Sequence, residues 1–272
     1  MKNLRKSLFL AVGIIMTGSI MLQCGGQNVQ EQVDLLIPQV VNYEYGENRE
    51  HLTAIDSLIR VTHGDESDRD YIEQALIGVL ENEQSTQAAL QYACEQLSII
   101  GSDDAVPALA DLLVKEDTSD MARYALERIP GEESVAALRG ALDTTSGAVK
   151  VGIINSLGER EDAESVPQLE ALIQSDNALV ASAAVTALGK IATPAATDAL
   201  ASAVENTSGR LHRDVLDAYL ECADALAEAG NTSRAMEIFN QLYDSSQPTP
   251  VQAAALTGII KKNPCAVLES PK

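Results

Sequence analysis

The sequence has 272 residues, and its 40 acidic and 19 basic residues give a formal net charge of -21 at pH 7. Binding to nucleic acid or to anionic headgroups normally begins with a basic patch that releases counterions, so this charge disfavours both and favours basic partners. Aromatic residues are scarce, and no segment beyond the N-terminal region alternates apolar and polar residues as a strand does, so we expect an all-α protein.

The first residues of the chain have the pattern of an export signal. Lys2, Arg5 and Lys6 precede an apolar run from Leu8 to Leu22. A helix needs about 20 apolar residues to cross a bilayer, so this run is too short for a comfortable permanent span. The pattern is typical of a cleaved secretory signal, and we predict a signal peptide over residues 1–23.

A cysteine, Cys24, follows the apolar run directly. Its position resembles the lipobox of bacterial lipoproteins, in which the cysteine is diacylated and becomes the new N-terminus. Met21, Leu22 and Gln23 depart from the usual residues of that motif, so cleavage slightly downstream, with an incidental Cys24, is the alternative. We predict a lipid anchor at Cys24, a tether within residues 24–28, and an exported protein of the periplasm or outer membrane that touches the membrane through this lipid only.

Residues 29–84 are predicted to form capping helices at the N-terminal end of a repeat array. The segments ENREHLTAIDSLIR and DYIEQALIGVL read as a helix pair joined by the longer loop VTHGDESDR. Four carboxylates gather at this loop, and they are Asp65, Glu66, Asp68 and Asp70. Such oxygen ligands could hold a hard cation such as calcium. Asp68 or Asp70 is also a good N-cap for the next helix, and we favour capping over a metal site.

Residues 85–206 contain a repeated pattern of apolar residues. Four segments share this pattern, and they begin at Val106, Val135, Val166 and Thr197. Each contains an anchor leucine, and the four anchors are Leu109, Leu138, Leu169 and Leu200. Upstream of each segment, apolar residues four apart, such as Ala93 and Leu97, indicate a first helix. A spacing of about 30 residues fits one helix pair per repeat, and such a pair buries its apolar side only by stacking on its neighbours.

Glycines recur just after the predicted first helices, and they are Gly101, Gly131, Gly158 and Gly189. The residue that ends a helix often takes a positive φ, which glycine adopts without strain, so we expect these glycines to end the first helices. Pro107 and Pro167 are expected in the first turn of the second helices, where a missing N–H costs nothing. The predicted architecture is an α-solenoid of stacked antiparallel helix pairs.

Residues 207–264 are predicted to form a helix hairpin and a final helix, followed by a tail over residues 265–272. The segment YLECADALAEAGNTSRAMEIFNQLY resembles a tetratricopeptide hairpin. The resemblance is carried by aromatic, small and turn residues, which are Tyr219, Ala223, Gly230, Ala235 and Phe239. Pro248 falls one residue later than in that repeat.

The helix-pair pattern resembles the HEAT repeat, particularly the short bacterial HEAT-like repeat that is also found in phycobilisome-type lyases. The blocks ACEQLSIIGSDDAVPALADLL, MARYALERIP and VKVGIINSLGER together look like an exported HEAT-repeat family common in planctomycete- and verrucomicrobia-like bacteria. That similarity covers roughly residues 43–260, and it implies a solenoid fold and export without implying an activity.

The sequence contains none of the common catalytic motifs that we sought. HExxH, GxSxG, P-loop and GxGxxG patterns are absent, and the three histidines, His51, His63 and His212, are far apart. A histidine–glutamate pair of the kind used by iron-binding HEAT hydroxylases is absent too. We therefore predict a protein that is not an enzyme and that needs no cofactor.

Two patterns indicate a surface for a partner. Basic residues concentrate between Lys115 and Arg160, and Tyr92 and Tyr124 occupy equivalent positions in successive first helices. The HEAT resemblance implies that the second helices line a concave face. We predict partner contacts at Asp111, Arg123, Tyr124, Arg139, Gln168 and Glu170. The alternative is that the arginines pair with neighbouring carboxylates and that the tyrosines pack between repeats.

The predicted function is that of a non-enzymatic scaffold of the bacterial cell envelope that binds a protein or a glycan. Because few aromatic anchors are available, we expect a contact of modest affinity. One alternative, implied by the repeat class, is an accessory subunit or enzyme of the bilin-lyase type. Another is a purely structural envelope spacer, which would have no saturable partner.

Overall fold

The computed structural model describes residues 28–262, and every regular element in this range is a helix. In chain order the α-helices are α1 (Val29–Val41), α2 (Glu50–Val61), α3 (Glu66–Glu81), α4 (Gln87–Ile100), α5 (Val106–Leu113), α6 (Ser119–Leu126), α7 (Glu132–Ala141), α8 (Gly147–Glu159), α9 (Val166–Leu172), α10 (Ala178–Ile191), α11 (Pro194–Asn206), α12 (Gly209–Glu228), α13 (Thr232–Leu242) and α14 (Thr249–Lys262). The predicted signal peptide, Cys24 and the predicted tail lie outside the described residues. Across the described helices we find none with the length and hydropathy of a membrane span.

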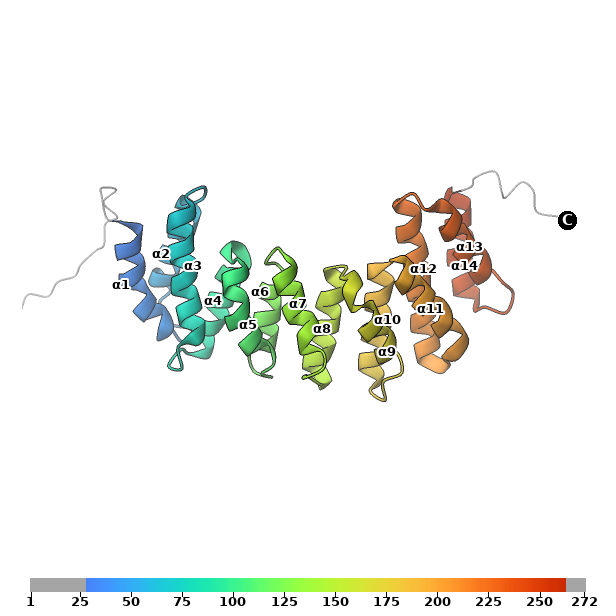
Figure 1. Ribbon diagram of the computed structural model, residues 1–272, viewed down its shortest axis with the longest axis horizontal. Coiled ribbons are helices and arrows are strands. Elements are labelled where there is room, and N and C mark those ends of the chain that lie inside the picture. The colour runs from blue at the N-terminus through green and yellow to red at the C-terminus, as the bar shows by residue number, and fades with distance from the viewer. Residues whose placement is uncertain (1–27, 263–272) are drawn as a thin grey trace, which may run out of the picture.

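The helices stack into two layers, and Figure 1 shows them as one elongated row from α1 to α14. Each second helix packs on the first helix of the next repeat, as α5 does on α6 and α9 on α10. Along the row, α4, α6, α8, α10 and α12 contact their neighbours in one layer, while α3, α5 and α7 do so in the other. This arrangement confirms the predicted all-α solenoid of stacked helix pairs.

The core runs continuously along the stack between the two layers. The four anchor leucines, Leu109, Leu138, Leu169 and Leu200, are each 0% exposed. Ala93 and Leu97, which mark the first helix upstream of Leu109, are also fully buried. Burying one leucine side chain contributes about 1.5 to 3 kcal/mol, so the repeated apolar positions are the main source of stability of the stack.

The prediction that all four recurring glycines end the first helices is wrong for three of them, and two of these three lie inside a first helix. Gly158 lies inside α8 and Gly189 lies inside α10. A Cβ added to Gly158 would lie 2.9 Å from the Cα of Ala187, and one added to Gly189 would lie 3.0 Å from the carbonyl oxygen of Ala218. Glycine is therefore present at these positions because the next helix of the layer packs directly against its backbone.

The other two glycines lie at helix boundaries, Gly101 at the end of a first helix and Gly131 at the start of a second. Gly101 follows the last residue of α4 with a negative φ of -64°, so it ends this helix without using the left-handed region. Gly131 has a φ of 106° and directly precedes α7, so it begins a second helix. The positive φ that the sequence pattern led us to expect is thus found only at Gly131 among the four.

The N-terminal end holds three helices, α1, α2 and α3, and the loop before α3 is shorter than the sequence suggested. Helix α3 begins at Glu66, so only residues 62–65 separate it from α2. The N-cap is Asp65, whose Oδ1 accepts a hydrogen bond from the backbone N–H of Asp68 at 3.3 Å. The prediction of Asp68 or Asp70 as the cap is therefore wrong, because α3 starts one turn earlier.

At the C-terminal end, α12 and α13 form a hairpin and α14 packs on both. Gly230 takes a φ of 88° in the short turn between α12 and α13. Tyr219, Ala223, Ala235 and Phe239 are all buried in the hairpin, with Tyr219 and Phe239 each 1% exposed. The likeness of this hairpin to a tetratricopeptide repeat stays a prediction.

Candidate functional site

The six residues that we predicted to contact a partner lie on both layers of the stack. Arg123 and Tyr124 belong to α6, whereas Asp111 lies on α5 and Arg139 on α7. Gln168 and Glu170 both lie on α9. The structure therefore does not bring the six side chains together as a single surface, and their predicted contacts with a partner stay predictions.

Arg139 is engaged by carboxylates, and two of the three belong to the following repeat. Its Nε donates to Oδ2 of Asp162 at 2.8 Å, and its Nη1 contacts Glu164 at 2.5 Å. A third carboxylate, Glu132 of α7, lies 3.8 Å from its Nη2. The hydrogen bond to Asp162 raises the pKa of Arg139, so the guanidinium is held charged. Arg139 therefore joins two repeats, as the ion-pair alternative states.

The contact between α6 and α8, which we call a joint of the stack, is polar because Arg123 and Arg160 take part in it. Nη1 of Arg123 donates to Oγ of Ser156 at 3.1 Å, and Ser156 in turn donates to Oε2 of Glu127 at 2.7 Å. Nη1 of Arg160 donates to the carbonyl oxygens of Glu127 and Ile129 at the end of α6. The bonds of Arg160 satisfy carbonyl groups that a helix end leaves without partners, and the bond of Arg123 to Ser156 links α6 to α8.

The two equivalent tyrosines differ in their surroundings. Tyr92 is 3% exposed, and its hydroxyl donates to the carbonyl oxygen of Leu52 and to Oδ1 of Asp56, which ties α4 to α2. Burial is the main cause that raises the pKa of Tyr92, followed by its hydrogen bond to Asp56. Tyr124 is 42% exposed. The packing alternative is thus confirmed for Tyr92, while Tyr124 is available at the surface.

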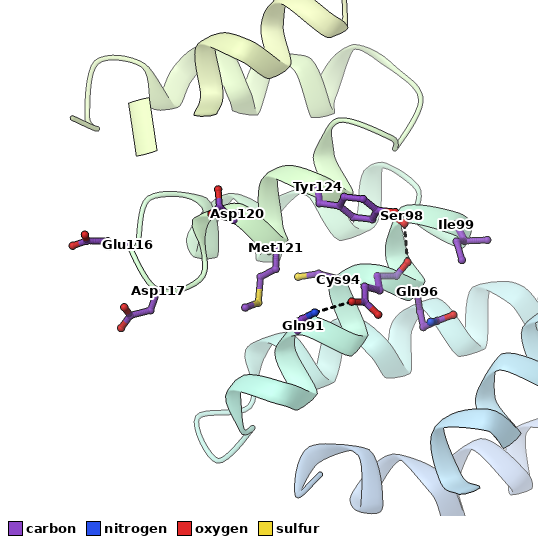
Figure 2. Close-up of a pocket in the computed structure, with 11 residues that line it drawn as sticks. Gln91, Cys94, Gln96, Ser98, Ile99, Glu116, Asp117, Asp120, Met121 and Tyr124 are labelled. Carbon is purple, nitrogen blue, oxygen red and sulfur yellow. Dashed lines mark hydrogen bonds between the residues drawn. The ribbon is translucent and has the colours of Figure 1, made fainter. Parts of the chain in front are cut away.

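A groove lies beside Tyr124, between the first helices α4 and α6. Its volume is about 640 Å³, and its lining residues are Gln91, Cys94, Glu95, Gln96, Ser98, Ile99, Glu116, Asp117, Asp120, Met121 and Tyr124. One wall is a single face of α4, on which the lining residues recur every three or four positions. The other wall is formed by α6 and the turn before it. Figure 2 shows the acidic side chains of that turn at one end of the groove, and Tyr124 and Ile99 at the other.

The groove is acidic, because Glu95, Glu116, Asp117 and Asp120 all line it and no lysine or arginine does. Asp120 is paired with Arg123 at 3.5 Å, but its side chain is 96% exposed, so water and salt screen the pair. Glu95 accepts a hydrogen bond from Nε2 of Gln91 at 2.9 Å. Within residues 28–262, the side chains of Glu116 and Asp117 form no ion pair with a basic group.

The opposite end of the groove is apolar. Ile99 is 65% exposed although the next residue, Ile100, is 8% exposed and belongs to the core. The guanidinium of Arg128 lies 3.7 Å from the centroid of the Tyr124 ring, so a cation–π contact covers part of this ring. An exposed isoleucine and an exposed tyrosine that line the same groove are the kind of anchors that a partner buries.

The floor of the groove contains the thiol of Cys94, which is fully buried. Burial raises the pKa of this thiol to about 12. The thiolate is the reactive form of cysteine, so a thiol with this pKa is a poor nucleophile near neutral pH. Cys94 therefore serves as a small packing residue beneath the groove.

The acidic loop before α3 does not assemble into a metal site in the described residues. Asp65 uses its carboxylate to cap α3, while Glu66, Asp68 and Asp70 follow along the first turns of the helix. Throughout residues 28–262, no group of three or more His, Cys, Asp or Glu side chains is placed to hold a metal ion.

Sequence reasoning found Tyr124 but missed Ile99, Glu116, Asp117 and Asp120. A signal for Ile99 was present, since two adjacent isoleucines on a helix lie about 100° apart and cannot both face a narrow core. The turn VKEDTSD carried a second signal, because three carboxylates follow the helix that ends at Leu113 with one lysine among them. Their proximity to α4 could not be deduced without the three-dimensional stack.

A family model for HEAT repeats matches residues 135–221, which extend from α7 into α12. A search of curated proteins finds no match to this sequence. Among solved structures, the chain is similar to lipovitellin, with a TM-score of 0.61 and 16% identity over 96% of this chain and 30% of that one. Its match therefore spans less than a third of the length of lipovitellin.

Two further solved structures are similar at lower TM-scores. Human deoxyhypusine hydroxylase in complex with glycerol has a TM-score of 0.37 and 18% identity, over 70% of this chain and 96% of that one. The complex of CpcE and CpcF of phycocyanin lyase from Nostoc has a TM-score of 0.41 and 18% identity, over 90% of this chain and 92% of that one. The chain is an α-solenoid whose residues 135–221 match a family model for HEAT repeats.

Proposed function

We propose that this protein is a non-enzymatic scaffold that binds another protein in the bacterial cell envelope. The observation that carries the proposal is the α4–α6 groove, where the exposed side chains of Ile99 and Tyr124 lie at the end opposite Glu116 and Asp117, which form no ion pair within the described residues. Exposed apolar anchors surrounded by polar groups are typical of protein interfaces. The stacked helix pairs supply a rigid, extended support for such a surface.

The chemistry of the groove favours a protein over the other partner classes. Its four carboxylates repel phosphate groups, which disfavours nucleic acid and phospholipid headgroups. A glycan is the remaining class expected from the sequence. An aliphatic side chain such as Ile99 gains most from contact with another apolar side chain, so we favour a protein.

We also propose that the protein is exported and anchored by a lipid at Cys24. Replacing Cys24 with serine should abolish incorporation of labelled palmitate in a bacterial host and move the protein from the membrane fraction to the soluble fraction. The reason is that the diacylglycerol is attached to the cysteine thiol. Cys265→Ser is the matched control and should keep the label. Label that persists in the Cys24→Ser protein would contradict the anchor.

A photo-crosslinking residue placed at Ile99 should capture one distinct protein in intact cells of the source organism. The matched control is the same residue at Leu179, which lies at the start of α10, in the same layer, outside the groove. Ile99 and Leu179 are 65% and 67% exposed, so both positions are equally accessible. The expected adduct forms at position 99, saturates with expression level, and is absent at position 179.

This experiment separates the proposal from its alternatives. A structural spacer has no saturable partner, so the absence of a saturable adduct at both positions would contradict the scaffold proposal. A bilin-lyase type subunit would instead give a saturable adduct with a pigment-carrying protein. Loss of the adduct on treatment with glycosidases would point to a glycan partner.

A further inference from the structure

We propose that the α4–α6 groove binds a short protein segment in which a lysine or arginine lies next to a large apolar side chain. The basic side chain would lie against Glu116 and Asp117, and the apolar side chain would pack on Ile99 and Tyr124. This inference rests on the proposed scaffold function, and it adds the chemistry and the orientation of the partner.

The acidic end of the groove is held in place before any partner arrives. Nε2 of Gln87, at the start of α4, donates to the carbonyl oxygen of Asp117 at 2.6 Å. The buried Oγ1 of Thr118 donates to the carbonyl oxygen of Leu112 at 2.8 Å. These two bonds fix the turn before α6 to both neighbouring helices. A partner therefore spends little free energy on ordering the backbone of this turn.

The apolar end is also fixed by its neighbours. Ile100 is buried in the core, so the backbone of α4 beneath Ile99 is anchored. The Arg128 guanidinium covers part of the Tyr124 ring, and Nη1 of Arg128 donates to the carbonyl oxygen of Tyr124 at 3.0 Å. The uncovered part of the ring and the side chain of Ile99 then form the surface on which an apolar partner side chain can pack.

The charge distribution decides which kind of segment fits. The lining contains four carboxylates and no lysine or arginine, so an acidic segment would be repelled and a basic one attracted. A bare metal ion fits less well, since no three of these side chains are placed to share one within the described chain. The two ends of the groove differ in chemistry, so a segment with one basic and one apolar side chain has a single favourable direction.

The test is a selection of short peptides displayed on phage against the purified protein, followed by fluorescence anisotropy with the enriched peptides. The expected peptides carry lysine or arginine beside leucine, isoleucine or phenylalanine. Their affinity should fall by about tenfold or more in the double variant Glu116→Lys with Asp117→Lys, because both attraction and electrostatic steering are reversed. Rising salt should weaken binding to the unchanged protein.

The chain offers a matched control for this double variant. Asp143 and Asp176 lie in the turns α7–α8 and α9–α10, which are the equivalents of the α5–α6 turn in the next two repeats, and both are exposed. Asp143→Lys with Asp176→Lys changes the net charge by the same amount and should alter the affinity by less than about twofold, as expected for distant surface sites. Ile99→Ser should weaken binding more than Leu179→Ser, and circular dichroism of each variant checks that it is folded.

Three outcomes would overturn the inference: no enriched peptide, enriched peptides without basic residues, or equal loss of affinity in the groove and control variants. Peptides that bind elsewhere on the stack would overturn this inference while the scaffold proposal stands. The scaffold proposal fails separately, when crosslinking in cells gives no saturable partner.

Discussion

Replacing Gly189 with alanine should lower the free energy of unfolding by about 1 to 2 kcal/mol, and replacing it with leucine should lower it by about 3 kcal/mol or more, because the site is overpacked. An added Cβ would lie 3.0 Å from the carbonyl oxygen of Ala218 and 3.1 Å from its Cα, so the backbone of α12 must move to admit it. This strain outweighs the gain in helix propensity, which is about 1 kcal/mol for glycine to alanine. Urea unfolding followed by far-ultraviolet circular dichroism measures the change.

Gly78 provides the matched control for this prediction. It lies inside α3, is exposed, and has no atom within 4 Å of the position that a Cβ would take. Gly78→Ala should therefore raise the free energy of unfolding by up to about 1 kcal/mol through helix propensity alone. The two alanine substitutions should have opposite signs. Stabilisation by both would show that the approach of α10 to α12 does not require glycine.

The stack uses two kinds of joint between neighbouring first helices. At α8–α10 and α10–α12 the contacts are small residues, with Gly158 facing Ala187 and Gly189 facing Ala218. At α6–α8 the contacts include the polar groups of Arg123, which fills the space beside the backbone of α8. Helices with small residues at their contacts approach closely, while long side chains keep them apart. The groove between α4 and α6 lies next to the polar joint.

The fold could be predicted from the sequence because the apolar pattern repeats. Leu109 and its three equivalents are fully buried, as their spacing indicates. The roles of Gly158 and Gly189 could not be predicted, because a glycine near the end of a helix has the same local pattern whether it ends the helix or contacts the next repeat. The contact partners, Ala187 and Ala218, are 29 residues away in each case. The sequence around each glycine does not show that it lies close to these alanines in space.

The candidate site was predicted less well than the fold. Arg139 was chosen for its place on a second helix, but its partner Asp162 is 23 residues along the chain. The acidic turn before α6 and the exposed Ile99 of α4 were passed over, since each carries only a local signal and the groove depends on their proximity. Tyr124 was found because it lies one repeat after Tyr92. The periodicity of apolar residues thus predicted the helices, while the groove between α4 and α6 depends on how these helices pack.

Asp162→Ala should lower the free energy of unfolding by about 2 to 3 kcal/mol, because it leaves the Arg139 guanidinium without its most buried partner. The side chain of Asp162 is 6% exposed and that of Arg139 is 18% exposed, so water replaces the lost bonds poorly. Arg139 donates to Asp162 through both Nε and Nη2, at 2.8 and 3.2 Å. Arg139 keeps its ion pair with Glu164 in this variant. The expected loss of stability therefore lies at or below the lower end of the range for breaking a buried ion pair.

The exposed pair Arg234–Asp198 is the matched control, with an N–O distance of 3.1 Å and side chains 39% and 75% exposed. Asp198→Ala should cost only about 0.2 to 1 kcal/mol, because solvent already screens this pair. Replacing both Arg139 and Asp162 with apolar residues of similar size should restore much of the stability lost in Asp162→Ala, since no buried charge is then left unpaired. Equal losses for Asp162→Ala and Asp198→Ala would contradict the conclusion that Arg139 and Asp162 hold successive repeats together.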